Sequence, residues 1–370
     1  MKWTAHRETL VAGLQKVVGV TEQRRAAMQV LTHVMLDAVA DGQLYLSATD
    51  LNLSIRTRID ADVEFAGQTT VSARKFLESL KELRQDRIRC ELLENDRLSV
   101  TAGTVNYMLA TIPAVDFPHF ETTVPAQTHP LDPAGLRRGL ESTLHAVPES
   151  EDAISVLGMF WHPVAPDRLR LVSSDGHRLA LNEIAFPSES FFSDAQGVVV
   201  PRKGVQEILR FLEKTETVEG ALQENRLIFQ TQDTYLSVHL LEEAFPKYEV
   251  IIPQTVQGRL EVPRAELQAA LRRMAVVSDT SAMHVRFLIS QNQLSLEAGS
   301  VDYGSAYEEI PLEYSGENFS IAFNIRYVMD VLQVLTGSHV WFEWVDEYHG
   351  GVFRDPQEPG IFALIMPLMI

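Results

Sequence analysis

The chain has 370 residues, with 32 Lys and Arg against 50 Asp and Glu, so its formal net charge is −18. Apolar residues make up 45% of the chain, which excludes wholesale disorder, and the length suggests two or three domains. The single cysteine, Cys90, excludes a disulfide framework and a cysteine-rich zinc site. The first residues lack the apolar segment of a signal peptide, and no apolar run reaches 18 residues. We therefore expect a cytoplasmic protein without a membrane span.

Six segments have the leucine spacing of amphipathic helices. Pro133 and Pro263 stand where proline suits a helix start. The expected helices are Arg7–Val17, Ser72–Arg84, Asp132–Thr143, Pro201–Lys214, Pro263–Val277 and Asn324–Leu335.

Between these segments lie stretches in which apolar and polar residues alternate, which is typical of strands with one solvated face. The expected strand regions are Leu53–Ile59, Leu98–Leu109, Leu227–Leu240, Val285–Leu296 and Val340–Trp344.

The elements recur three times in the same order. Leu44, Leu169 and Leu294 lie in similar alternating segments, 125 residues apart in each case. Chance similarity among amphipathic segments is the alternative, but it does not explain the constant order. We predict an α+β protein of three similar domains, each with two helices packed on antiparallel sheet. Proline-rich turns place the domains at residues 1–124, 125–252 and 253–370.

Charge is unevenly distributed over these elements. The six helical segments hold 16 of the 32 basic residues and nine of the 50 acidic ones. An evenly acidic protein would repel DNA phosphates, whereas basic helices within an acidic chain favour one surface that faces a polyanion. The alternative is an ordinary solvated helix surface, because Lys and Arg are good helix formers.

The common catalytic motifs are missing. The chain has no phosphate-binding glycine loop and no H-E-x-x-H metal motif, so we expect no cofactor and no metal. Ser174-Asp175-Gly176-His177 contains the residue types of a catalytic triad, but consecutive residues cannot converge as triad members do. A turn after a strand is the better interpretation.

Several segments together resemble the bacterial sliding clamps, the beta subunits of DNA polymerase III, over essentially the whole chain. They are Met1–Thr4, Ala73–Phe76, Ile112–Pro118, Ser174–Ala180, Val200–Gly204, Phe245–Tyr248, Phe323–Tyr327 and Ile365–Ile370. The resemblance implies a DNA clamp fold whose chains dimerise head to tail into a closed ring, with helices lining the hole. It also implies a non-enzymatic processivity factor that encircles duplex DNA without reading its sequence. Implied partners are the DNA polymerase III catalytic subunit, the clamp-loader complex and other proteins with clamp-binding motifs.

The resemblance also implies roles for single residues. Positions that touch DNA are Arg24, Arg25, Arg74, Arg202 and Lys203. A pocket for partner peptides comprises Ser174, Gly176, His177, Arg178, Leu179, Pro246, Val250, Ile251, Asn324, Tyr327, Met366, Pro367, Leu368, Met369 and Ile370. The dimer interface comprises Lys75, Tyr107, Leu109, Val276, Val277 and Glu308.

The chain departs from the family pattern in places. The loop Arg24–Leu31 lacks the usual proline, and Met369 replaces a common basic residue. Thr104 and Asn106 stand where other clamps can carry interface arginines, so the dimer should depend more on apolar contacts. Two alternatives stay open. One is a clamp paralogue with changed partners, and the other is an enzyme on a three-repeat scaffold, which would need a pocket of converging titratable groups.

Overall fold

The computed structural model describes residues 1–22, 28–123, 125–149, 157–192, 196–278 and 283–369. The chain forms two compact units. Unit 1 contains Met1–Pro133 and Gln206–Leu240, and unit 2 contains Ala134–Val205 and Leu241–Ile370.

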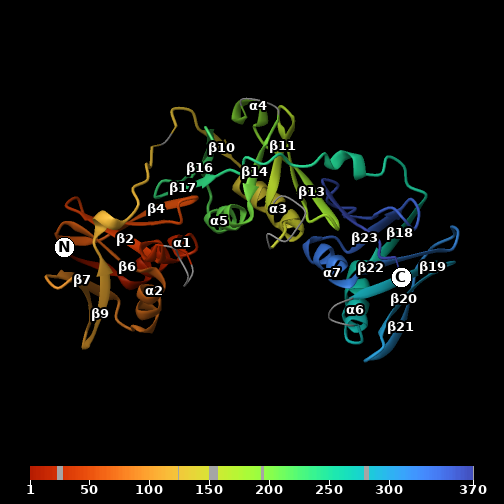
Figure 1. Ribbon diagram of the computed structural model, residues 1–370, viewed down its shortest axis with the longest axis horizontal. Helices are drawn as coiled ribbons and strands as arrows, with labels where there is room; N and C mark the ends of the chain where they lie inside the picture. The colour runs from red at the N-terminus through yellow and green to blue at the C-terminus, as the bar shows by residue number, and fades with distance from the viewer. Residues whose placement is uncertain (23–27, 124, 150–156, 193–195, 279–282, 370) are drawn as a thin grey trace. The chain divides into compact units, whose positions relative to one another are not determined.

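Three repeats of one element order follow each other along the chain (Figure 1). Each repeat has a strand, a helix, four strands, a second helix and three strands, with one extra strand in repeat one and one short extra helix in repeat two. Repeat one comprises β1 (Lys2–His6), α1 (Arg7–Val17), β2 (His33–Val39), β3 (Gln43–Thr49), β4 (Leu53–Asp60), β5 (Asp62–Phe65), β6 (Gly67–Ser72), α2 (Ala73–Glu82), β7 (Arg87–Leu93), β8 (Arg97–Ala102) and β9 (Val105–Ile112). Repeat two comprises β10 (His129–Leu131), α3 (Pro133–Thr143), β11 (Gly158–Ala165), β12 (Arg168–Ser174), β13 (Arg178–Ala185), α4 (Ser188–Phe191), β14 (Val198–Pro201), α5 (Arg202–Leu212), β15 (Val218–Gln223), β16 (Arg226–Gln230) and β17 (Thr234–His239). Repeat three comprises β18 (Gly258–Pro263), α6 (Arg264–Ala275), β19 (His284–Ser290), β20 (Gln293–Ser300), β21 (Gly304–Pro311), β22 (Phe319–Asn324), α7 (Ile325–Val334), β23 (His339–Trp344), β24 (Gly351–Arg354) and β25 (Ile361–Ile365).

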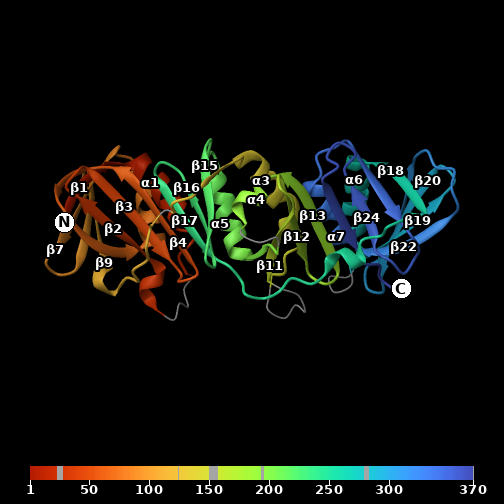
Figure 2. The ribbon, with the colours of Figure 1, turned by 90° about the horizontal axis from the view of Figure 1, so that it is seen from above.

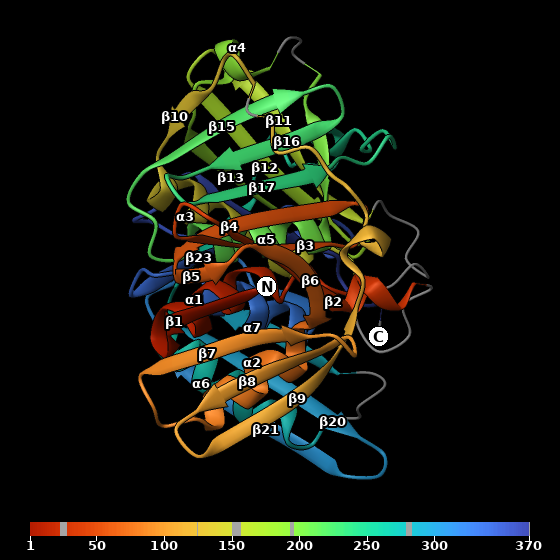
Figure 3. The same ribbon diagram turned by 90° about the vertical axis from the view of Figure 1, so that its left-hand side faces the viewer.

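Unit 1 is built on one continuous sheet, in the order β10-β15-β16-β17-β4-β3-β2-β6-β9-β8-β7-β1-β5. Figure 3 shows β15, β16, β17, β4 and β3 side by side. The antiparallel pair β4–β17 joins the third strand after helix α1 in repeat one to the last strand of repeat two.

Unit 2 has two sheets in place of one. Its larger sheet runs β14-β11-β12-β13-β25-β24-β23-β18, and a smaller one runs β21-β20-β19-β22. Neighbouring strands β11, β12 and β13 can be followed in Figure 2. Here β13 pairs with β25, so the third strand after helix α3 of repeat two meets the last strand of repeat three.

The sequence predicted all six long helices within two residues at each end. All five expected strand regions contain strands, and three of them fold as hairpins of two strands each. Leu98–Leu109 forms β8 and β9 around Gly103, whose φ of 59° suits a tight turn. Leu227–Leu240 forms β16 and β17, and Val285–Leu296 forms β19 and the first half of β20. Alternation continues through a short turn, so periodicity alone does not reveal the reversal.

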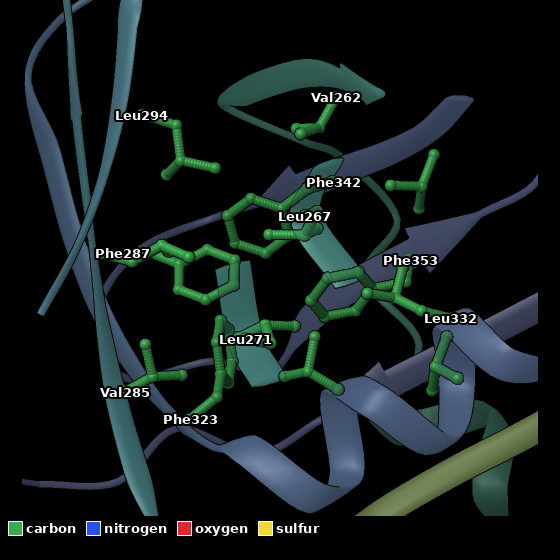
Figure 4. Packing of buried hydrophobic residues seen from close by; sticks show 14 of the residues in the cluster. Val262, Leu267, Leu271, Val285, Phe287, Leu294, Phe323, Leu332, Phe342 and Phe353 are labelled. Carbon is green, nitrogen blue, oxygen red and sulfur yellow. The ribbon is translucent and has the colours of Figure 1, made fainter. Parts of the chain in front are cut away.

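The three leucines of the repeat occupy equivalent places. Leu44, Leu169 and Leu294 lie on β3, β12 and β20 and are fully buried. In repeat three the core around Leu294 also contains Phe287, Phe323, Phe342 and Phe353 (Figure 4). The aromatic rings contact each other, with the Phe287 and Phe342 ring centroids 5.6 Å apart.

Small residues bring the first helix of each repeat close to the sheet. A Cβ atom at Gly139 on α3 would lie 2.7 Å from Leu171 Cδ1 and 2.9 Å from Ile184 Cγ2. Gly13 on α1 meets Leu46 and Ile59 in the same way, and Ala270 stands at the matching position of α6. Close helix-to-sheet packing therefore limits side-chain size at this position.

Among the described residues, no helix is long and apolar enough to cross a membrane. Cys90 lies on β7 with no exposed surface, and burial raises the pKa of its thiol.

His145, just after α3, is a half-buried histidine whose ring Nδ1 atom is shielded from solvent. Burial, with a smaller effect of the nearby Arg178 charge, lowers its pKa from 6.5 to about 3. The folded protein therefore keeps this imidazole neutral.

Replacing Gly139 by leucine should overpack α3 against β12 and β13 and destabilise the protein by about 1–3 kcal/mol. Urea unfolding measures the change. Glu141→Leu, on the exposed side of the same helix, is the matched control and should cost less than about 0.5 kcal/mol. Equal effects of the two substitutions would contradict the packing argument.

Because the folded pKa of His145 is below its unfolded value, the unfolded chain binds the extra proton between these two values. The free energy of unfolding should therefore fall as pH decreases from 6.5 towards 3. His145→Phe should reduce this slope by up to about 1.4 kcal/mol per pH unit. Urea titrations of the parent protein and of His145→Phe at successive pH values test this, and an equal slope in both proteins would contradict it.

Candidate binding surfaces

The loop between β12 and β13 is held by side-chain bonds to its own backbone. Asp175 Oδ1 accepts hydrogen bonds from the His177 and Arg178 amides, both at 3.0 Å. Ser174 Oγ donates to the Arg178 carbonyl at 2.9 Å, and the Gly176 amide donates to Ser174 Oγ at 3.3 Å. Gly176 has a φ of 85°, which is easy for glycine. This is the turn that the sequence predicted, and it leaves Gly176 and His177 exposed.

A buried apolar cluster lies next to this loop in unit 2. Leu179 on β13 pairs directly with Leu364 on β25, and both are buried. The cluster comprises Val172, Leu179, Leu181, Tyr248, Val352, Phe362 and Leu364, with Phe160, Phe245 and Ile252 packed against it. The connector that follows β17 therefore lies on the same cluster as Leu179.

Tyr248 anchors that connector. Its ring is 4% exposed, and its hydroxyl lies 2.8 Å from His162 Nδ1 and accepts a hydrogen bond from Arg170 Nη1 at 3.0 Å. Arg170 in turn pairs with Glu183. Burial lowers the pKa of His162 and raises that of Tyr248, so both groups favour their neutral forms. The network fixes a single helical turn at Tyr248–Ile251.

This turn displays apolar side chains next to its buried anchor. Val250 is 79% exposed and Ile251 is 45% exposed, whereas Tyr248 and Ile252 pack into the cluster. Pro246, two residues before the anchor, is also exposed. Exposed apolar side chains on a rigid turn are typical of a surface that meets a partner.

Arg178 links the loop to α7. Its guanidinium bonds Asp175 Oδ2 at 3.0 Å and Asp330 Oδ2 at 2.6 Å, and lies 4.2 Å from the centroid of the Tyr327 ring. Asn324 caps α7 by accepting a hydrogen bond from the Arg326 amide at 2.9 Å. These predicted pocket residues therefore hold the loop and helix α7 together.

The C-terminal residues continue along both sheets of unit 2. The Met366 amide donates to the His177 carbonyl at 2.9 Å, and the Leu368 amide donates to the Ala322 carbonyl at 2.8 Å. Met366, Leu368 and Met369 are 39%, 37% and 73% exposed, and Pro367 is half-buried between them. Ile370 lies outside the described residues. Thus the loop, the connector, α7 and the C-terminal segment come together in unit 2.

The basic residues predicted to touch DNA have different environments. Arg24 and Arg25 lie outside the described residues. Arg74 is exposed on α2, and Lys203 is half-buried on α5. Arg202 donates to the Val147 carbonyl and bonds Glu149 Oε1 at 3.0 Å, so it also stabilises the chain after α3.

Arg326 was not among the residues expected to touch DNA, although it shares a helix position with two that were. Arg74, Lys203 and Arg326 are each the second residue of the second helix of a repeat. Arg326 is exposed. The signal was available, because aligning the three predicted helices places a basic residue at this position every time.

The residues predicted for the dimer interface lie on strands β9 and β21, on helix α2 and just after helix α6. Tyr107 and Leu109 are half-buried on β9, and Lys75 on α2 is exposed and pairs with Glu78 at 2.8 Å. Glu308 on β21 pairs with Arg273, whose hydrogen bond lowers the pKa of the carboxyl. Val276 is 79% exposed just after α6, and Val277 beside it is half-buried.

Three family models match successive parts of the chain. They describe the N-terminal, central and C-terminal domains of the DNA polymerase III beta subunit, at residues 1–121, 130–247 and 249–369. The Pseudomonas putida beta sliding clamp is 32% identical to the chain, with both covered completely.

Solved structures agree with these matches. A crystal structure of the Caulobacter crescentus beta sliding clamp has a TM-score of 0.92 at 29% identity, covering 100% of this chain and 99% of that one. The Pseudomonas aeruginosa sliding clamp bound to griselimycin has a TM-score of 0.90 at 31% identity, with both chains covered completely. With its three repeats, full-length matches and about 30% identity, the chain belongs to the family of bacterial beta sliding clamps, the DNA polymerase III beta subunits, and is a DNA polymerase processivity clamp.

Proposed function

We propose that two copies of this chain close head to tail into a ring around duplex DNA in the cytoplasm. In this proposal the protein is not an enzyme. It tethers the DNA polymerase III catalytic subunit, the clamp loader and other partners through short peptides that bind the apolar cluster of unit 2. Its domains are residues 1–124, 125–252 and 253–370.

The pairing of strands between repeats carries the assembly proposal. β4 pairs with β17, and β13 pairs with β25. In both pairs the third strand after the first helix of a repeat, here called its third strand, meets the last strand of the next repeat. The remaining third strand is β21 and the remaining last strand is β9. Within the described residues β21 pairs only with β20, and β9 pairs with β8 and briefly with β6. An unpaired strand edge favours pairing with another chain, and head-to-tail pairing under two-fold symmetry closes a ring.

The two pairs within the chain also predict the register between chains. Ile55 pairs with Leu236, and Ala180 pairs with Ala363. Ile55 on β4 and Ala180 on β13 each lie four positions before the isoleucine that pairs with the repeat leucine, and Ala306 holds this position on β21. On the last strand of repeat one, Tyr107 holds the position of Leu236, because Tyr107 pairs with Val100 as Leu236 pairs with Phe229. Ala306 should therefore face the partner subunit's Tyr107, and Gly304 the partner's Leu109.

Apolar exposure at these edges supports the proposal. Val105 and Met108 on β9 are 37% and 53% exposed, and Tyr307 on β21 is 56% exposed. Paired strands would cover such side chains. With Thr104 and Asn106 in place of arginines, the interface gains from apolar contact rather than from ion pairs.

A disulfide between Ala306→Cys and Tyr107→Cys tests the register. Directly opposed residues of antiparallel strands have Cα atoms about 4.5–5.5 Å apart, which suits a disulfide. Mild oxidation of the double variant should give a covalent dimer on denaturing gels. Ala306→Cys with Leu109→Cys is shifted by two residues and should cross-link poorly. Monomers alone, or a ladder of long polymers, would contradict the closed ring.

Peptide binding should depend on the anchor of the connector. Tyr248→Phe removes the hydroxyl that meets His162 and Arg170 and leaves the ring in place, so the turn that displays Val250 and Ile251 should loosen. We expect affinity for a labelled clamp-binding peptide to fall about fivefold, or about 1 kcal/mol, in fluorescence anisotropy. Tyr303→Phe, on an exposed ring, is the control.

Deleting Met366–Ile370 should weaken binding at least tenfold without dissociating the dimer. Unchanged binding in both variants would exclude this surface.

DNA contact should be electrostatic and weak without a loader. Each phosphate contact contributes about 0.9 to the slope of log affinity against log salt. Arg326→Ala and Arg74→Ala should each lower that slope by up to this amount, whereas the strand arginine variant Arg97→Ala should not.

A clamp loaded on nicked circular DNA should leave after linearisation. Persistent binding to open linear DNA would contradict topological retention.

A further inference from the structure

The loop between β3 and β4 in unit 1 repeats the hydrogen bonds of the loop between β12 and β13. Asp50 Oδ1 accepts from the Asn52 and Leu53 amides at 3.0 and 2.6 Å, as Asp175 does from its two amides. Thr49 Oγ1 donates to the Leu53 carbonyl at 2.8 Å and accepts from the Leu51 amide at 3.0 Å. Ser174 makes the same two bonds.

The strands beside this loop also match. Ser54 pairs with Ser237 where Leu179 pairs with Leu364, and Arg56 pairs with Tyr235 where Leu181 pairs with Phe362. Pro118 follows Phe117 after β9, as Pro246 follows Phe245 after β17. The backbone around the apolar cluster of unit 2 is therefore present a second time in unit 1.

Unit 1 has a hollow at this place. A cavity of about 410 Å³ is lined by Leu51, Ser54, Pro118, Phe120, Ile228 and Tyr235, among others. Tyr235 also lines an adjoining hollow of about 300 Å³ that contains Arg56 and Gln230. These sizes are those of sites that hold a few side chains of a ligand.

The conformation of Leu51 indicates that this hollow has a function of its own. It is 54% exposed and has a φ of 79°, a left-handed conformation that is strained for leucine. Gly176 makes the equivalent turn without strain, so the turn itself does not require a leucine. Strained backbone that presents an exposed apolar side chain to a cavity is typical of functional sites.

The chemistry of the floor differs between the two places. Leu179 is replaced by Ser54 and Phe362 by Tyr235, both of which line the hollow, and Leu364 is replaced by the buried Ser237. Nearby arginines already have acidic partners, since Arg56 lies 3.5 Å from Asp37 and Arg58 lies 2.9 Å from Asp233. The rim contains both His119 and Arg226 and both Glu121 and Glu224. A floor whose serine and tyrosine hydroxyls carry no charge suits an uncharged hydrogen-bonding side chain.

We propose that this hollow of unit 1 is a second peptide site, which binds a short extended peptide anchored by amide or hydroxyl side chains instead of leucine or phenylalanine. The proposal rests on the proposed function, because it takes the apolar cluster of unit 2 as a peptide site. A partner with both kinds of segment would engage one chain twice and so bind with higher avidity.

The test uses the full-length dimer and two synthetic peptides. Peptide A is a clamp-binding peptide with apolar anchors, and peptide B is the same peptide with glutamine at each anchor. His119→Cys, on the rim of the hollow, carries an environment-sensitive dye, and the fully buried Cys90 does not compete for the label. Peptide B should change the dye signal saturably and peptide A should not. Peptide A should still bind unit 2 by anisotropy.

A second variant exchanges the floor. Ser54→Leu, Tyr235→Phe and Ser237→Leu together should let peptide A bind unit 1, which raises its stoichiometry from one to two per chain by calorimetry. Leu51→Gly should weaken peptide B at the dye without changing peptide A in unit 2.

The proposal is overturned if peptide B gives no saturable signal up to about 1 mM, a limit of about 4 kcal/mol in binding free energy. That result decides the question even if the exchanged floor fails to fold. If peptide A binds unit 2 while peptide B fails at unit 1, only the second site is wrong. If peptide A fails at unit 2, the proposed function is wrong as well.

Discussion

Backbone groups at the edge of a β-sheet need partners, and this requirement organises the whole chain. In repeats one and two, the third strand after the first helix pairs with the last strand of the following repeat. β4 with β17 and β13 with β25 are the two pairs that result. Each unit is continuous because of one such pair, and the strands left over, β9 and β21, point to assembly with a second chain.

The same strand pairs also create the surfaces where ligands can bind. Pairing brings a hairpin loop, a strand from the next repeat and the connector between repeats to one place. In unit 2, Leu179, Leu364 and Phe362 make this place apolar, and Tyr248 holds the connector over it. In unit 1 the same backbone presents Ser54, Ser237 and Tyr235. Backbone pairing thus sets the shape of the site, and a few side chains on the paired strands set its chemistry.

Ion pairs and hydrogen bonds of single side chains join neighbouring elements within this framework. Arg178 joins the β12–β13 loop to α7, and Arg202 bonds the chain that follows α3. Both were expected to meet a partner or DNA. Their contacts within the chain do not prevent such a role, but they show that an arginine in a basic helix can first serve the fold. Helix charge measured along the sequence therefore overstates the charge that is free to meet a polyanion.

The sequence by itself determined the local elements and their repetition. Leucine spacing gave six helices within two residues, because a helix buries one stripe and the stripe repeats every three to four residues. The family resemblance identified the segments that come together in unit 2. The sequence pattern did not reveal the hairpin turns at Gly103 and elsewhere, because the alternation of apolar and polar residues continues through a short turn. Only the tertiary structure decided which strands pair between repeats, that Tyr248 is anchored by His162 and Arg170, and that the Asp50 loop copies the Asp175 loop. These features depend on contacts between residues far apart in the chain, and no local pattern records such contacts.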